Sequence, residues 1–81
     1  MLLKTKIRGY YNNVIDFVRD WNLEKEFRTF TDFKGEDLDG WFDVCDISDG
    51  EIISELLDKQ RGNFILDFNE DRDVFIISEV V

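Results

Sequence analysis

The sequence feature that most constrains the fold is an amphipathic helix whose start is marked by a capping box. Ser48 is followed three residues later by Glu51, the spacing at which the two residues cap the first turn of a helix. Gly62 can close the same helix as a left-handed residue. The apolar positions behind the cap recur at helical spacing: Ile52, Ile53, Leu56 and Leu57. The sequence therefore predicts a helix over residues 49–60 with one apolar side.

The first part of the chain predicts a strand followed by a second helix. Residues 2–8 alternate weakly between apolar or hydroxyl side chains and basic ones, which is typical of an edge strand whose lysines discourage further pairing. A helical start is the competing interpretation. Residues 12–22 carry apolar side chains at helical spacing, with Asn12 or Asn13 available as the N-cap, so we expect a helix there.

Four further strands are expected. Residues 25–33 show alternation with aromatic side chains on both sides, and residues 41–47 place Phe42 and Val44 opposite Asp43 and Cys45. Near the C-terminus, residues 64–68 alternate, and the apolar, β-branched residues 74–81 follow a turn. The two last segments predict a hairpin, with residues 74–81 as a central strand or one buried on both faces.

The predicted fold is a small α+β domain, with two helices on one face of a mostly antiparallel sheet. The predicted order of elements is β-α-β-β-α-β-β. Because the chain has only 81 residues, it can build one hydrophobic core, so we expect residues 1–81 to form a single domain. A hydrophobic fraction of 43% indicates that the chain folds despite its net charge of −9.

The charge is distributed unevenly along the chain. Residues 1–31 contain six basic and four acidic side chains, whereas residues 32–81 contain four basic and fifteen acidic ones. Within residues 32–51, Lys34 is the only basic residue among eight acidic ones. An acidic surface repels nucleic acid and anionic membranes, so we expect a basic protein as partner and neither of those as direct ligands.

Several functional classes lack the residues that they need. The chain has no histidine, which excludes histidine-based catalysis, and it offers little room for a catalytic cleft, so we expect no enzyme and no cofactor. Cys45 is the only cysteine, so no intrachain disulfide can form, and the ligands of a zinc site are missing. We expect Cys45 to be a buried apolar residue, because it lies within an apolar segment. We expect the protein to be cytoplasmic, because no segment resembles a signal peptide or a membrane span.

Residues 35–46 partly match a calcium-binding EF-hand loop. With Gly40 at the sixth position, Asp37, Asp39, Asp43 and Asp46 occupy ligand positions. Position one is Gly35, position twelve is an aspartate where the motif has glutamate, and the preceding segment is expected to be a strand. A weak calcium-binding module is therefore an alternative function, and we expect no specific metal site.

The acidic stretch and the final turn supply the candidate partner-binding residues. Asp49 and Glu51 are weaker candidates, because residues 48–51 cap a helix. Trp41 is included as a possible aromatic anchor, although a tryptophan at this place is more often part of the core. The candidates are Asp32, Glu36, Asp37, Asp39, Trp41, Asp43, Asp46, Glu70, Asp71 and Asp73.

In size, charge and compactness the chain resembles the small acidic DNA-mimic inhibitors encoded by bacteriophages. The resemblance is one of class and includes no diagnostic motif. It implies a protein that presents a DNA-like negative surface to a basic, nucleic-acid-binding host protein, such as a nucleoid protein or a restriction, CRISPR or repair factor, and competes with nucleic acid. The alternative is a structural or assembly protein that forms a homodimer by pairing of its C-terminal strand, residues 74–81.

Overall fold

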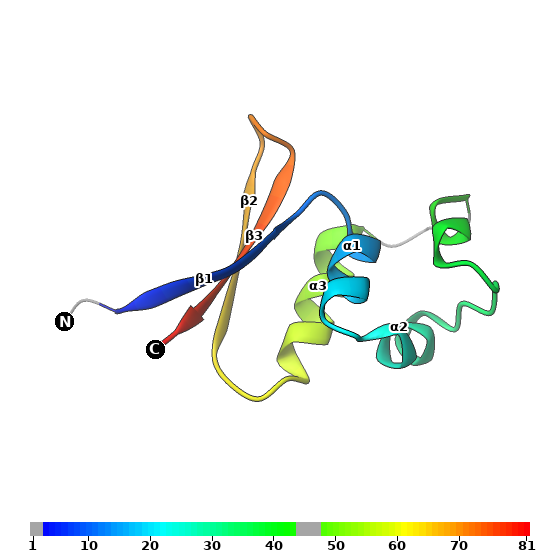
Figure 1. Ribbon diagram of the computed structural model, residues 1–81, viewed down its shortest axis with the longest axis horizontal. Helices are drawn as coiled ribbons and strands as arrows, with labels where there is room; N and C mark the ends of the chain where they lie inside the picture. The colour runs from blue at the N-terminus through cyan, green and yellow to red at the C-terminus, as the bar shows by residue number, and fades with distance from the viewer. Residues whose placement is uncertain (1–2, 44–47) are drawn as a thin grey trace.

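The computed structural model describes residues 3–43 and 48–81, and it confirms the predicted α+β class. Figure 1 shows a twisted sheet on one side of the molecule and the helices on the other. The elements in chain order are β1 (Thr5–Tyr11), α1 (Val14–Asp20), α2 (Glu24–Thr31), the 3₁₀ helix η1 (Leu38–Asp43), α3 (Asp49–Asp58), β2 (Phe64–Asn69) and β3 (Val74–Val80).

The sheet is antiparallel and has the strand order β1-β3-β2. The predicted C-terminal hairpin is confirmed, and β3 is the central strand as expected. The first strand is an edge strand, also as expected, and its register shifts between Ile7 and Gly9. Both edges of β3 are therefore occupied, so the predicted homodimer could pair along this strand only by displacing β1 or β2.

Only one face of the sheet is covered by helices. Ile77 in the middle of β3 is fully buried, and α1 lies against β1 while α3 lies against β2. The opposite face is open, with Ile7 51% exposed, Tyr10 59% exposed and Ile65 43% exposed. The sheet is thus buried on one face only, and β3 is not buried on both faces.

The helices predicted around residues 12–22 and 49–60 are confirmed, with bounds a few residues shorter. The side-chain oxygen of Asn13 accepts a hydrogen bond of 2.9 Å from the amide of Asp16 and caps α1. Ser48 Oγ accepts one of 3.3 Å from the amide of Glu51 and caps α3, as its spacing predicts. Helix α3 ends at Asp58, and Gly62 lies in the following loop with a φ of 114°.

The strand predicted over residues 25–33 is wrong, because this segment contains helix α2. Leu23, Phe27 and Phe30 recur at helical spacing, so a helix places all three side chains in or against the core. A strand would place them on different faces, which is why the alternation is misleading. Asp32 ends the helix in the left-handed conformation with a φ of 59°. The sheet consequently has three strands in the described part of the chain, and α2 is a helix that the sequence did not predict.

The strand predicted over residues 41–47 is also wrong where the structure describes it. Residues Leu38–Asp43 form η1, and Leu38 and Trp41 lie three residues apart with 5% and 4% exposure. A 3₁₀ helix has three residues per turn, so this spacing places both side chains on one side, facing the core. Cys45, with the rest of the predicted strand, lies outside the described residues.

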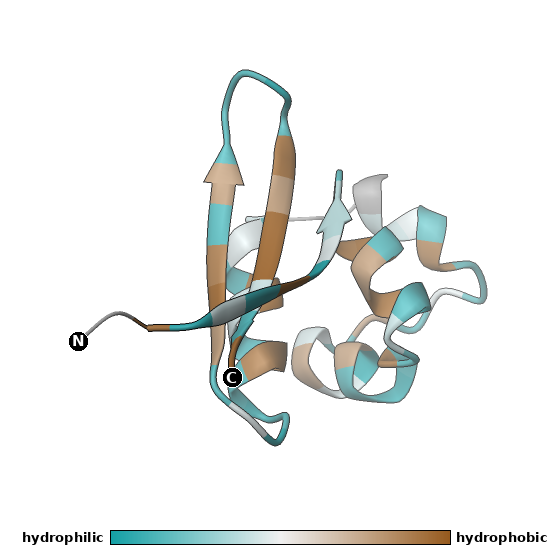
Figure 2. Cartoon of the chain, turned by 60° about the vertical axis from the view of Figure 1, so that its left-hand side comes forward, coloured by the Kyte–Doolittle hydropathy of each residue, from teal (hydrophilic) through white to brown (hydrophobic). Residues whose placement is uncertain are grey.

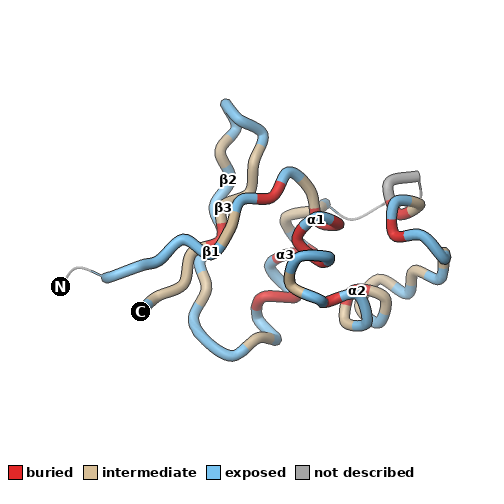
Figure 3. The backbone as a smooth tube through the Cα atoms, viewed as in Figure 1, coloured by how far each residue is buried: buried red, intermediate tan, exposed pale blue. Residues whose placement is uncertain are grey.

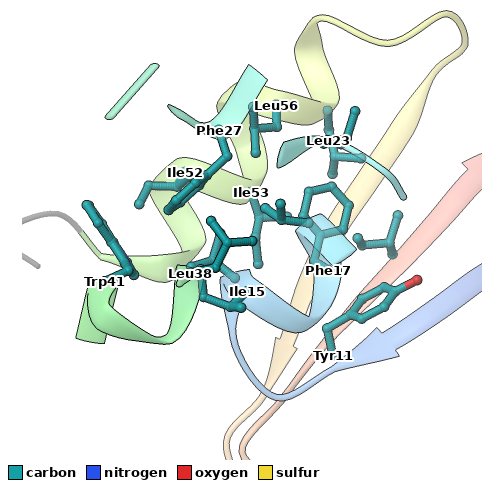
Figure 4. Close-up of a cluster of buried hydrophobic side chains, with 14 residues drawn as sticks. Tyr11, Ile15, Phe17, Leu23, Phe27, Leu38, Trp41, Ile52, Ile53 and Leu56 are labelled. Carbon is teal, nitrogen blue, oxygen red and sulfur yellow. The ribbon is translucent and has the colours of Figure 1, made fainter. Parts of the chain in front are cut away.

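The core lies between the helices and the covered face of the sheet. Figure 3 shows that buried positions concentrate on the inward sides of α1, α2 and α3. Figure 4 shows Trp41 at one end of the cluster and Tyr11 at the other, with Ile53 near the middle. No charged side chain in the described part of the chain is buried, so the excess of carboxylates lies on the surface.

Substitution by alanine should have opposite effects at two glycines, one in the first turn of α3 and one in the loop after it. Gly50 lies inside the helix, and a Cβ there would meet the Phe75 ring at 3.4 Å, an ordinary contact. Gly50→Ala should therefore stabilise the protein by about 0.5–1 kcal/mol, since alanine loses less backbone entropy in a helix. Gly62→Ala should destabilise it by about 1–3 kcal/mol, because its φ of 114° is strained for any other residue.

Urea denaturation of both variants measures these two free energies. Equal effects of the two substitutions would contradict the described conformation of the loop after α3.

Candidate functional site

The candidate acidic residues of the stretch after α2 form an exposed loop, and a basic residue from another element approaches them. Asp32, Glu36, Asp37 and Asp39 are exposed. The guanidinium of Arg19, on α1, lies 3.4 Å from an oxygen of Asp37 and 3.3 Å from an oxygen of Asp39. Lys34 lies 3.9 Å from Asp32. The loop is therefore less negative than its sequence suggests, because Arg19 adds a cation to Lys34.

Arg28, on α2, holds the backbone of the same loop. Its guanidinium donates hydrogen bonds to the carbonyl oxygens of Phe33, Gly35 and Glu36, and also to the carboxylate of Glu24. A planar guanidinium can bridge several acceptors at once, whereas a lysine ammonium cannot match this geometry. The loop thus has a fixed path, and its shape depends on one side chain that the sequence did not single out.

Trp41 is not a surface anchor, which corrects its inclusion among the partner-binding residues. Its side chain is 4% exposed and packs edge-to-face on Phe27, with ring centroids 5.2 Å apart. Asp46 and the side chain of Asp43 lie outside the described residues, so their part in any site stays a prediction.

A second acidic surface is built from α3 and the β2–β3 hairpin, and we name it the α3–hairpin surface. Sequence reasoning found its turn residues, treated Glu51 as a weaker candidate and missed Glu55. The missed signal is the spacing of Glu51 and Glu55, one helical turn apart on the side opposite the apolar stripe. The exposed acidic residues of this surface are Glu51, Glu55, Glu70, Asp71 and Asp73.

The two acidic surfaces differ in how far they are neutralised. In the described part of the chain, none of the five carboxylates of the α3–hairpin surface lies within 4.0 Å of a basic nitrogen. Figure 1 shows that the loop after α2 lies at the end of the molecule away from the sheet, whereas the hairpin turn projects from the sheet. The candidate residues are therefore divided between two places and do not form one row.

Asp49, at the start of α3, has a structural role, as expected from its place among the capping residues. Its carboxylate accepts a hydrogen bond of 3.0 Å from the amide of Val14 at the start of α1. One carboxylate thus satisfies a free amide of the neighbouring helix, which ties the N-termini of α1 and α3 together.

The structure changes the argument about calcium. The segment before the partial EF-hand loop is helix α2 and not a strand, so the loop is preceded and followed by helices. Asp37 and Asp39, however, are paired with Arg19, which contributes positive charge where a calcium ion would need ligands. No group of three or more potential metal-ligating side chains is found among the described residues.

A partly buried polar cluster joins β1 to the C-terminal end of α1. The hydroxyl of Tyr11 donates a hydrogen bond of 2.5 Å to the carboxylate of Asp20 and accepts one of 2.8 Å from the indole nitrogen of Trp21. Burial of the phenol, together with the bond to Asp20, raises the pKa of Tyr11 to about 12. The cluster links the strand to the helix, and a hollow of about 300 Å³ lies beside it, lined by Arg8, Asp20 and Trp21.

No protein-family model matches the chain, and neither the curated proteins nor the solved structures provide a match. The site must therefore be interpreted from its own geometry. Among the described residues, no helix has the length and apolar character needed to cross a membrane.

The raised pKa of Tyr11 predicts a pH-dependent stability. Because the folded-state pKa is above the ordinary value of 10.0, the contribution is complete below pH 10 and is lost as the pH rises through about 12. The free energy of unfolding should fall in this window by at most about 1.4 kcal/mol per pH unit. Urea denaturation between pH 9 and about 12 should show this fall in the wild type and a smaller one in Tyr11→Phe. Identical pH profiles would contradict the assignment.

Arg28 yields a prediction for the acidic loop. Arg28→Lys should destabilise the protein by about 1–3 kcal/mol, since the loop carbonyls lose donors that lysine cannot replace together. Hydrogen exchange should accelerate in residues 33–36 and stay unchanged in β3. Lys25→Arg is a suitable control, because Lys25 is an exposed residue on the same helix. Equal exchange in both variants would show that Arg28 does not hold the loop.

Proposed function

We propose that this protein is an acidic inhibitor that binds a basic, nucleic-acid-binding protein and competes with nucleic acid for it. The observation that supports the proposal most is the α3–hairpin surface, with five exposed carboxylates that have no basic partner within the described residues. Carboxylates left unpaired in this way repel one another, and a basic partner relieves that repulsion.

The physical basis of the competition is that both ligands use the same cationic side chains. Lysine and arginine residues that bind phosphates on DNA can also bind exposed carboxylates on a protein surface. Glu51 and Glu55, about one turn apart on a helix, are about 6 Å apart along its axis. A rigid helix and a hairpin hold these groups in place, so less side-chain ordering opposes binding than on a mobile acidic tail.

The structure moves the expected centre of this interaction. Sequence reasoning placed it on residues 32–46, where Arg19 and Lys34 now pair with Asp32, Asp37 and Asp39. We therefore propose the α3–hairpin surface as the main contact and the loop after α2 as a secondary one.

The proposal requires no catalytic step and no cofactor. A partner of this kind places the protein in the cytoplasm, and the single cysteine fits that compartment because it cannot form an intrachain disulfide. A bacterial host and a phage origin are further parts of the proposal that follow from the resemblance to DNA-mimic inhibitors.

Self-association is a second candidate, supported by the open face of the sheet. Ile7, Tyr10 and Ile65 are exposed there, and β3 offers no free edge. A homodimer would therefore pack face to face. Sedimentation of the wild type and of Ile65→Lys tests this, since a dimer at the open face should dissociate when the lysine is introduced.

Capture from a bacterial lysate tests the inhibitor proposal. Immobilised protein at low salt should retain nucleic-acid-binding proteins, which elute between about 50 and 200 mM salt because counterion release dominates such contacts. A double-stranded DNA oligonucleotide should release the same proteins. If neither salt nor DNA reduces the amount of protein retained, the proposal is contradicted.

Two variants with equal change in charge locate the surface. Glu51→Gln, Glu55→Gln and Asp73→Asn together should weaken retention strongly. The control triple variant combines Asp32→Asn, Glu36→Gln and Asp39→Asn, which remove as much charge from the other acidic surface. Equal weakening by both would argue for a diffuse effect of net charge.

A further inference from the structure

The α3–hairpin surface encloses an apolar groove beneath its carboxylates. The groove has a volume of about 690 Å³, within the range of protein ligand sites. Its apolar walls come from α2, β2 and β3, and its acidic rim comes from α3. The apolar residues are Phe30, Leu66, Phe68 and Phe75, and the acidic ones are Glu51 and Glu55.

The groove continues past the start of α3. A second hollow of about 600 Å³ shares Gly50, Phe68 and Phe75 with the first and adds Asp49 and Asp73. The rings of Phe68 and Phe75 lie 4.8 Å apart at an angle of 50°. These two rings therefore form the apolar floor that both hollows share, with carboxylates on either side.

Phe68 is the most accessible part of this floor. Its side chain is 40% exposed, although it lies on the covered face of the sheet, where its neighbours in register are buried or half-buried. Figure 2 shows the hydrophobic stretches of β2 and β3 next to the helices. An aromatic side chain left partly in water within a groove gains free energy when a partner's apolar side chain covers it.

The charges of the groove specify the chemistry of the occupant. Its described lining residues include Asp49, Glu51, Glu55 and Asp73 and no basic side chain. Lys59 lies outside this lining, with its Nζ 5.3 Å from the ring centroid of Phe30. An anionic or purely apolar occupant would be disfavoured at such a rim, whereas a cationic one is attracted.

We infer that the groove between α3 and the β2–β3 hairpin binds a basic amphipathic peptide segment of the partner protein. One large apolar side chain of that segment packs on Phe68 and Phe75, and lysines or arginines beside it pair with the rim carboxylates. This inference rests on the proposed function and specifies how its partner is recognised. It gives the interaction a component that salt does not screen, because apolar contact does not depend on ionic strength.

Two synthetic peptides test the inference by fluorescence anisotropy. The first is composed of lysine and leucine with the leucines on one helical side, and the second has serine in place of every leucine. The leucine peptide should bind the wild type about tenfold more tightly than the serine peptide, the effect of burying one apolar side chain. Equal affinities would overturn the inference.

Phe68→Ala and Ile65→Ala form a matched pair of variants. Both residues lie on β2 with similar exposure, 40% and 43%, but on opposite faces of the sheet. Phe68→Ala should weaken the leucine peptide about tenfold and leave the serine peptide unchanged, whereas Ile65→Ala should affect neither. Equal effects of the two variants would contradict binding in the groove.

A second pair of variants keeps the test valid if Phe68→Ala folds poorly. Gly50→Leu adds a side chain beside the Phe75 ring, which a Cβ at this position would already meet at 3.4 Å, and leucine is a good helix former. Gly50→Leu should block the leucine peptide, and Gly50→Ala, which adds only a methyl group to the same lining, should weaken its binding less. Binding that is unchanged in Gly50→Leu would overturn the inference.

The outcomes separate the inference from the proposed function. If both peptides bind equally and salt weakens both steeply, the electrostatic proposal stands and the groove is not the site. If neither peptide binds the wild type at low salt, both fail. If sedimentation without peptide shows a dimer that Phe68→Ala dissociates, the occupant is a second copy of this chain and the assignment to a partner is wrong.

Discussion

The apolar side of α3 is the contact on which the rest of the structure depends. Its four apolar residues are buried, and the helix contacts α1, α2 and β2. Full burial of each such side chain contributes about 1.5–3 kcal/mol, a favourable term that is set against the entropy cost of ordering the chain. The same helix carries Glu51 and Glu55 on its other side, so one element supplies both the core and the acidic rim.

The arrangement leaves the sheet asymmetric. One layer of helices covers one face, with α1 and α3 against the strands and α2 packed on those two helices. Because α3 does not extend over the whole width of the hairpin, Phe68 and Phe75 remain accessible beside it. The carboxylates cannot enter the small core without a large desolvation penalty, so they gather at the edges of the covered face.

Local signals in the sequence predicted part of this structure well. The capping box at Ser48 and the helical spacing behind it located α3, and the alternation after Gly62 located the hairpin with β3 in the centre. Residues 25–33 were misassigned because aromatic residues at every third or fourth position also fit an alternating pattern. Leu38 and Trp41 were missed as a 3₁₀ turn, since a separation of three residues is not a strong signal by itself.

The candidate site was predictable in its chemistry and not in its location. Counting carboxylates identified an acidic protein, but the sequence does not show that Arg19 reaches Asp37 and Asp39 from another helix. It also does not show that Glu51 and Glu55 lie beside Phe68 and Phe75 in one groove, because these residues come from separate elements. Tertiary packing decides which charges are paired and which remain available.

The central claim is that the α3–hairpin surface, and not the loop after α2, receives a basic partner. Amide chemical shifts of the ¹⁵N-labelled protein, followed by NMR during titration with the lysine–leucine peptide, test this claim most directly. We predict the largest changes in α3 and in residues 66–75, with small changes in residues 32–39. The largest changes in residues 32–39, or on the open face at Ile7 and Tyr10, would contradict it.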